Sequence, residues 1–174
     1  MRIPVFVSCP TALNPEQDDS RRMIMAELKR MQFEPRALGR SDYPTESPLR
    51  EVLVIAKHCS GGVILGFEQS YAETLIEKRG VPDPTDNTKT REKVSEKVVM
   101  PTSWNHLEAG ILFGLNLPLL VFKEPGIGGG VFDTGVTDNF VHAMPTEKLK
   151  PAQRRALSDV FLKWNYRVRE HYYR

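Results

Sequence analysis

The sequence has few cysteines, little net charge and no hydrophobic run long enough to span a membrane. Its two cysteines, Cys9 and Cys59, have neither the spacing of a metal site nor the number of a disulfide framework. The net charge of +2 is too small to indicate binding to nucleic acid or to an anionic membrane. No apolar run approaches about 20 residues, and the N-terminal run is too short for a signal peptide. We therefore expect a cytoplasmic protein with no metal site and with neither nucleic acid nor a membrane as partner.

Internal repeats and low-complexity tails are also absent from the sequence. Its 174 residues, of which 40% are hydrophobic, fit one domain with a single core. We therefore expect residues 1–174 to form a single domain.

Three short apolar runs have the composition of buried strands. They are IPVFVS at 3–8, GGVILGF at 61–67 and LPLLVF at 117–122. Continuous apolar runs with β-branched residues are typical of parallel strands that are covered on both faces. FEPRALG at 33–39 could form a short edge strand, because Pro35 would cost a central strand one ladder hydrogen bond.

Helical patterns lie between and after these runs. Apolar residues recur at helical spacing at about 15–31, 48–60 and 103–114, and in a long C-terminal segment at about 147–173. FVHAM at 140–144 could add a short strand. This alternation predicts an α/β fold with an open, mostly parallel, flavodoxin-like sheet and helices on both faces. In such folds, ligands bind beyond the carboxyl ends of the strands.

Residues 69–100 form a segment longer than a usual connection between a strand and a helix. Its centre, VPDPTDNTKT, is rich in turn formers and offers little apolar surface for packing. Such insertions are commonly lids, binding loops or mobile segments, and we expect this one to be mobile without ligand and to flank the binding site.

One carboxylate lies where a helical pattern is otherwise apolar. In SWNHLEAGILFG at 103–114, Glu108 follows Trp104 by four residues and precedes Leu112 by four. A carboxylate that is removed from water is destabilised or becomes protonated, so it is either satisfied by a partner or retained for chemistry. Two interpretations stay open at this point. Glu108 can be catalytic, or it can pair with a buried arginine or with backbone amides.

The predicted sheet brings several residues to one crevice. Ser8 ends the first strand and Pro10 follows it, Phe67 ends another strand, and Trp104 and Glu108 lie in the first turns of a helix. We expect Phe67 and Trp104 to shape a pocket around Glu108, although a tryptophan at this position is also typical of the core.

Two familiar motifs are incomplete. GIGGG at 126–130 lacks both the Lys-Ser/Thr of a P-loop and the helix of a dinucleotide fingerprint, because VFDTG follows it. Ser8 has no G-x-S-x-G elbow around it, and a lone His106 is more typical of a surface residue. The sequence therefore excludes both phosphate-binding motifs and disfavours a serine hydrolase triad.

The combination of VFVS, GRSDYPTESPLREV, GGVILGF and SWNHLE resembles the TIR (Toll/interleukin receptor) domain over about residues 3–145. Enzymatic members of that family carry their essential acid in a Trp-x-x-x-Glu motif, which Trp104 and Glu108 match. The continuation EAGILFGLNLPLLVF is also similar to nucleoside deoxyribosyltransferase-like proteins. Two features depart from the family: Asn105 stands where its enzymes often have cysteine, and the insertion at 69–100 is long.

The resemblance implies cleavage of the bond between nicotinamide and ribose in NAD, with Glu108 as the essential acidic residue. The ADP-ribose would then be hydrolysed, cyclised or transferred, as in an NAD glycohydrolase or an ADP-ribosyl cyclase or transferase. NAD would be the substrate, and no cofactor is expected. Ser8, Pro10, Arg40 and Asp42 would contact the nucleotide. Small bacterial TIR proteins often make ADP-ribose-derived signals in antiphage defence. We therefore also expect self-association and a downstream effector that senses the product.

Two alternatives accompany this hypothesis. The first is a nucleoside 2-deoxyribosyltransferase or a nucleotide N-glycosidase, and the second is a non-catalytic TIR-like binding module. NAD suits a single carboxylate because nicotinamide leaves without being protonated, whereas the base of a neutral nucleoside needs further acidic help. Asp42 and Glu68 are candidates for that help.

The two cysteines are predicted to stay apart. Cys9 follows the carboxyl end of one predicted strand, and Cys59 precedes the amino end of another. Opposite edges of a parallel sheet lie farther apart than the roughly 7 Å between Cα atoms that a disulfide allows. We therefore expect no disulfide.

Overall fold

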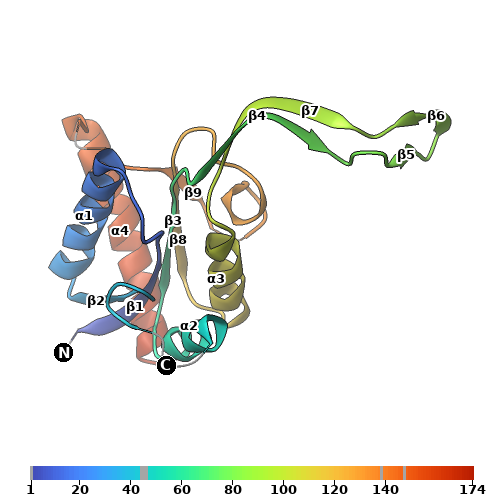
Figure 1. Cartoon of the computed structure of the whole chain (residues 1–174). Coiled ribbons are helices and arrows are strands. Elements are labelled where there is room, and N and C mark those ends of the chain that lie inside the picture. Colours follow the sequence, from blue (N-terminus) through green and yellow to red (C-terminus); the bar gives the residue numbers. More distant parts are fainter. Residues whose placement is uncertain (1, 44–46, 138, 147) are drawn as a thin grey trace.

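The protein is built around a five-stranded sheet in which every neighbouring pair of strands is parallel. The computed structural model describes residues 2–43, 47–137, 139–146 and 148–174. The strands follow the order β2-β1-β3-β8-β9 across the sheet (Figure 1). Their bounds are Phe33–Arg36 for β2, Ile3–Ser8 for β1, Gly62–Gly66 for β3, Leu119–Lys123 for β8 and Val141–Ala143 for β9. The predicted open, flavodoxin-like α/β sheet is confirmed.

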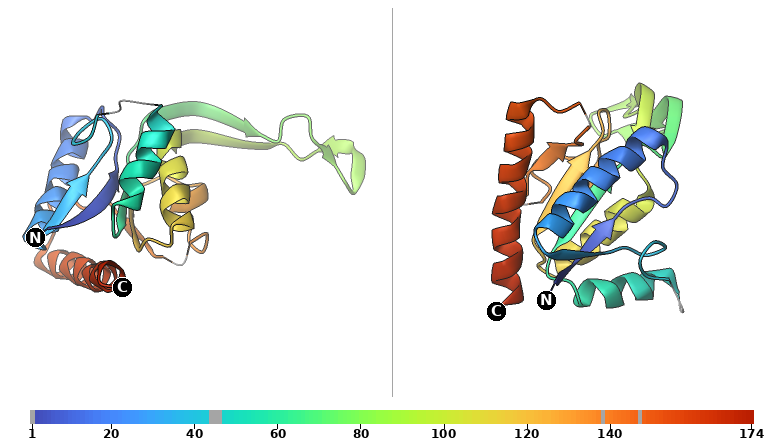
Figure 2. Two further views of the ribbon diagram at one scale, coloured as in Figure 1. Left: turned by 90° about the horizontal axis from the view of Figure 1, so that it is seen from below. Right: turned by 90° about the vertical axis from the view of Figure 1, so that its left-hand side faces the viewer.

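Helices cover both faces of this sheet, as the views in Figures 1 and 2 show. The helices α1 (Pro15–Arg30) and α4 (Pro151–Tyr172) pack on one face, where they share a core cluster with the sheet. The helices α2 (Pro48–Lys57) and α3 (Ser103–Gly114) pack on the other face in a second cluster. The C-terminal helix was predicted to begin near residue 147, which lies outside the described residues.

The alternation of side chains along each strand produces the two clusters. Val5 and Val7 of β1 belong to the cluster under α1 and α4, whereas Phe6 belongs to the cluster under α2 and α3. In β3, Val63 and Ile64 divide in the same way. Since successive side chains of a strand point to opposite faces, only a continuous apolar run can fill both layers.

The first helix begins where its capping residues predict. The Asn14 side chain accepts a hydrogen bond of 2.9 Å from the backbone N–H of Gln17, and the Gln17 side chain accepts one of 3.2 Å from the backbone N–H of Asn14. Pro15 occupies the first turn, where its missing N–H costs nothing. The strand β2, which contains Pro35, lies at the edge of the sheet as predicted.

The insertion at 69–100 is an antiparallel ribbon. Its strands β4 (Ser70–Glu77) and β7 (Lys93–Met100) pair along their length, and β5 (Pro82–Asp83) and β6 (Asp86–Thr90) pair beyond them. The ribbon projects away from the body of the protein (Figure 1). These paired strands were not predicted from the sequence: the turn formers are confined to the tip, while the flanking segments have the composition of strands.

The base of the ribbon lies where the insertion was expected. The ribbon begins just after β3 and ends just before α3, so both of its ends lie beside the carboxyl edge of the sheet. The mobility of this segment stays a prediction.

Both cysteines are free, so the prediction that they form no disulfide is confirmed. Burial raises the pKa of the Cys59 thiol to about 12, although the nearby Arg36 opposes this shift. No helix in the described part of the chain is both long and apolar enough to cross a membrane.

Candidate functional site

A cavity of about 370 Å³ lies at the carboxyl edge of the sheet. It is lined by the loop after β1, the loop after β2, the residue that precedes β4 and the first turns of α3. In the sheet, β2 lies on one side of β1 and β3 lies on the other, so the direction in which successive strands are added reverses at β1. Open α/β sheets bind ligands at such reversal points. We call this cavity the switch-point pocket.

Glu108 reaches this pocket from the buried stripe of α3. Its side chain is largely out of contact with solvent, with a residue exposure of 8%. The neighbouring positions of the stripe, Asn105, Ala109 and Leu112, are also buried. Among the described residues, none forms an ion pair with Glu108. The pairing with a buried arginine that the sequence left open is thus not found among them.

The surroundings of Glu108 raise the pKa of its carboxyl group to about 7. Burial is the main cause, because it disfavours the charged form, and a hydrogen bond with the Ser8 side chain opposes it. Ser8 Oγ accepts a hydrogen bond of 2.8 Å from Asn105 Nδ2, so the hydroxyl hydrogen is left for the carboxylate. Near neutral pH the group can therefore exchange a proton, which is typical of functional carboxyls.

Trp104 lies one turn before Glu108 on the same side of α3. Its side chain is 41% exposed and lines the switch-point pocket, so it does not belong to the core. The turn is held by Thr102, whose hydroxyl accepts a hydrogen bond of 3.2 Å from the backbone N–H of Trp104. An aromatic face is thereby presented beside the Glu108 carboxyl group within one cavity.

The structure brings some of the expected site residues together and separates others. Pro10, Trp104 and Glu108 line the pocket, and Ser8 lies beneath it as the partner of Glu108. Phe67 does not reach the pocket, because its side chain is fully buried in the cluster under α1 and α4.

Arg40 and Asp42 are engaged within the protein. Asp42 forms an ion pair with Arg36 and accepts a hydrogen bond from Ser41, and the Arg36 guanidinium holds the pKa of Asp42 below its usual range. Arg40 donates hydrogen bonds of 2.7 and 2.9 Å to the carbonyl oxygens of Pro10 and Thr11. Arg40 therefore fixes the pocket wall, and Asp42 stabilises its own loop.

Sequence reasoning missed several parts of the site. Asn105 was noted only as a departure from the TIR pattern, yet it orients Ser8 from the buried stripe. Its position three residues before Glu108 was the available signal. Gln69 and Gly39 also line the pocket, and no local pattern marks them. Burial raises the pKa of Cys9, another lining residue, to about 11, so its thiol is protonated and is not a ready nucleophile.

The glycine-rich loop at 126–130 has a structural role here. Gly130 adopts a positive φ of 56°, and a Cβ on it would lie 2.8 Å from Nδ1 of His106. The His106 ring, which is half-buried, also makes an edge contact with Phe132 at 5.4 Å between ring centroids. The loop therefore packs against α3, in agreement with the exclusion of a P-loop.

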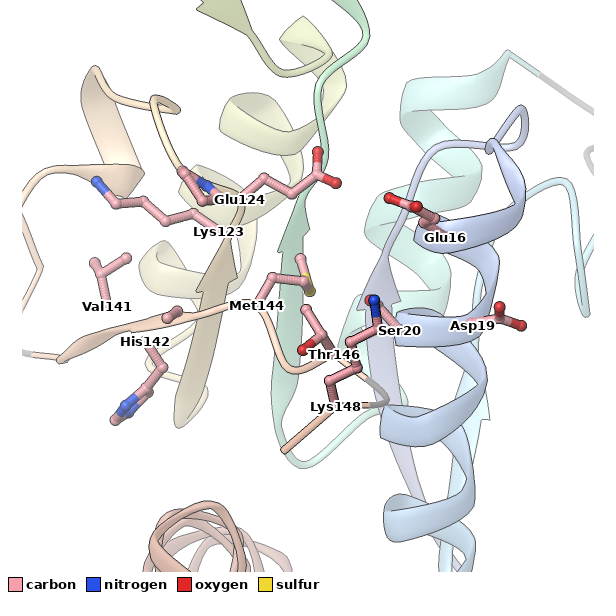
Figure 3. Close-up of a pocket in the computed structure, with 12 residues that line it drawn as sticks. Glu16, Asp19, Ser20, Lys123, Glu124, Val141, His142, Met144, Thr146 and Lys148 are labelled. Atoms are coloured by element: carbon pink, nitrogen blue, oxygen red, sulfur yellow. The ribbon is translucent and has the colours of Figure 1, made fainter. Parts of the chain in front are cut away.

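A larger cavity of about 610 Å³ lies elsewhere, between α1 and the strands β8 and β9. Figure 3 shows the side chains of Glu16 and Glu124 on its facing sides. Glu124 accepts hydrogen bonds from the Gln17 side chain at 3.0 Å and from the backbone N–H of Glu68 at 2.6 Å. This carboxylate thus ties α1 to the strand ends. We favour the smaller pocket as the functional site because it contains a buried carboxylate without a cationic partner among the described residues.

No group of three or more His, Cys, Asp and Glu side chains in the described ranges has the arrangement of a metal site. Comparison of the chain with protein families, with curated proteins and with solved structures finds no match.

Proposed function

We propose that the protein cleaves the N-glycosidic bond between nicotinamide and ribose in NAD, with Glu108 as the catalytic residue. The main support is the buried carboxyl group of Glu108, which forms no ion pair with any described residue. Glu108 and Trp104 line the same pocket. The pocket volume of about 370 Å³ falls within the range of small-molecule sites, about 300–1,000 Å³.

The chemistry of NAD matches a single carboxylate. Nicotinamide is a cationic leaving group in NAD, so its departure needs no proton. Positive charge develops on the ribose, and a carboxylate held beside it offsets this charge. A preorganised electrostatic contact of this kind lowers a barrier by about 3 kcal/mol or more. Trp104 would stack on a planar ring within the same pocket.

The Ser8 and Asn105 side chains fix the position of the acid. The Asn105 amide holds Ser8 Oγ, and the Ser8 hydroxyl donates its hydrogen to Glu108. The carboxylate is therefore oriented, and no cation among the described residues neutralises it. Water or another nucleophile takes the place of nicotinamide on the ribose, so the ADP-ribose is hydrolysed, cyclised or transferred. In this proposal the ADP-ribose-derived product acts as a signal in antiphage defence that a downstream effector senses, and a second copy of the chain completes the active assembly.

A nucleoside or nucleotide N-glycosidase is the second candidate, and one observation favours it. Because the pKa of Glu108 is raised to about 7, part of the population carries a proton at neutral pH. A protonated Glu108 could assist the departure of a neutral base. The dependence of rate on pH separates the two candidates. With the carboxylate active, NAD cleavage rises as the pH rises through about 7, whereas a general acid produces the opposite slope.

Glu108→Gln tests the proposal, because it keeps the shape of the side chain and removes its charge. We expect NAD cleavage to fall by about a hundredfold or more while the protein still folds. Mass spectrometry of products from NAD and from deoxynucleosides, at several protein concentrations, measures this loss. Glu34→Gln, which changes an exposed carboxylate of β2, is the matched control and should retain activity.

Two results would count against the catalytic role of Glu108. One is a Glu108→Gln protein that melts much earlier than wild type yet retains its turnover per folded molecule. The other is a wild-type protein that cleaves neither class of substrate at any concentration. That second result would instead favour a non-catalytic binding module.

A further inference from the structure

A third cavity, of about 490 Å³, adjoins the switch-point pocket on the α1 side of the sheet. It lies between α1 and the ends of β1 and β2. Cys9, which follows β1, lines both cavities. We call the cavity of about 490 Å³ the cationic cleft.

Four basic side chains line this cleft. Arg21, Arg22 and Lys29 come from α1, and Arg40 comes from the loop after β2. Arg21 and Lys29 are eight residues apart, which places them on the same face of the helix, two turns from each other. None of the described residues that line the cleft carries a carboxylate. The cleft therefore has the electrostatic character of an anion site.

The ion pairs around the cleft leave part of this charge uncompensated. Asp18 pairs with Arg21 and Arg22, with distances of 2.7 Å between nitrogen and oxygen in both cases. Lys29 has no carboxylate partner among the described residues, and Arg40 bonds to neutral carbonyl groups. Two cations thus lie at the cleft without a balancing acid in the described part of the chain.

The buried part of Arg40 adds a second, independent observation. Its terminal nitrogen donates to the carbonyl groups of Pro10 and Thr11, but its Nε is buried and has no hydrogen-bond partner among the described residues. A buried donor of a charged group is costly to leave unpaired. An acceptor supplied by a ligand would satisfy it.

We propose that the cationic cleft binds the phosphate or diphosphate group of a nucleotide. Phosphate oxygens are strong acceptors, and arginine and lysine side chains are their usual partners. Two sources of this group are compatible with the geometry. One is the diphosphate of the substrate that Glu108 acts on, and this source rests on the proposed function. The other is a separate phosphorylated molecule that binds beside the pocket.

Pyrophosphate is the direct probe of this site. Calorimetric titration at low ionic strength should show pyrophosphate binding to wild type. The double variant Arg22→Gln/Lys29→Gln should weaken it by about tenfold or more, because it removes two charges from the cleft. Both side chains are exposed, so the fold should be retained, and a melting curve checks this. Arg30→Gln is the matched control: it deletes an exposed charge of the same helix outside the cleft and should leave binding within about twofold of wild type.

Three results would overturn the proposal. In the first, wild type binds no pyrophosphate at millimolar concentration. In the second, the double variant and Arg30→Gln weaken pyrophosphate binding equally. In the third, the double variant binds pyrophosphate as tightly as wild type does.

Kinetics then identify the source of the phosphate group. If the group belongs to the substrate, pyrophosphate competes with NAD and raises its KM. If it belongs to a second molecule, pyrophosphate changes kcat without competing. Glu108→Gln should still bind pyrophosphate, since Glu108 lies outside the cleft. A protein that binds pyrophosphate but cleaves no NAD would therefore retain the anion site and lose only the proposed function.

Discussion

Two carboxylates near the carboxyl edge of the sheet show how single residues acquire different roles. Arg36 pairs with Asp42 and lowers the pKa of its carboxyl group. Glu108 is buried, the Ser8 hydroxyl is the one group among the described residues that stabilises its charge, and its pKa is raised. The first carboxylate stabilises the native loop when ionised. The second is destabilised when ionised, and such an arrangement is common at functional sites.

The shifted pKa of Glu108 predicts a dependence of stability on pH. Its value rises from 4.5 to about 7, so the folded protein holds a proton that the unfolded chain has already lost. Glu108 therefore lowers the free energy of unfolding as the pH rises from about 4.5 to about 7, by about 3 kcal/mol in total. Below that range the penalty is absent, and above it the penalty is complete.

Glu108→Gln should remove this penalty. Relative to wild type, the variant should be more stable by about 3 kcal/mol near pH 8 and nearly equal to it near pH 4. Urea unfolding of both proteins at the two pH values measures the difference, and Glu34→Gln controls for the loss of an exposed charge. A stability difference that does not vary with pH would contradict the shifted pKa.

At the scale of elements, the ribbon of β4 and β7 stands apart from the rest of the fold (Figure 1). Its two strands pair with each other and not with the central sheet. Val99, near its base, packs against the cluster under α2 and α3. The two hydrophobic clusters otherwise lie outside the ribbon. The ribbon therefore contributes little to the stability of the body.

Truncation of the ribbon tests this independence. Ala72 and Val98 face each other in register, so residues 73–97 can be replaced by Asn-Gly, which favours a tight hairpin turn. We expect the melting temperature to change by only a few degrees, because no buried core residue is removed. Thermal unfolding followed by circular dichroism measures this change. A large decrease would show that the ribbon supports the body.

At the scale of the whole molecule, both layers depend on one sheet. Each central strand contributes side chains to both hydrophobic clusters, so neither cluster can form without the other. We therefore expect the body to unfold as one cooperative unit. The helix α4 seals one layer through Phe161, which is fully buried and lies 5.7 Å from Phe122 between ring centroids.

Phe161→Ala should destabilise the whole body. Removal of a buried aromatic ring costs about 3–5 kcal/mol, and the loss should appear as a single shifted transition in urea. Leu162→Ala, at a position that is 51% exposed in the same helix, should change stability much less. Tryptophan fluorescence and circular dichroism should give coincident curves for each variant. Separate transitions would show that the two layers unfold independently.

The sequence by itself determined the elements whose local pattern has a single physical solution. A continuous apolar run such as 3–8 or 61–67 can be buried only between two layers, so the parallel sheet could be predicted. The capping residues around Pro15 located the start of α1. Helical spacing placed Glu108 on a buried stripe, because that position depends only on the neighbouring turns.

Tertiary structure decided which residues meet. From the sequence, both Phe67 and Trp104 were expected to line the pocket. The packing of α1 and α4 buries Phe67, whereas Trp104 is exposed in the first turn of α3. The ion pair of Asp42 requires the loop after β2 to fold back on that strand. The cationic cleft exists only because α1 lies beside the ends of two strands. Contacts of this kind join residues far apart in the chain or across a folded loop, and local patterns carry no information about them.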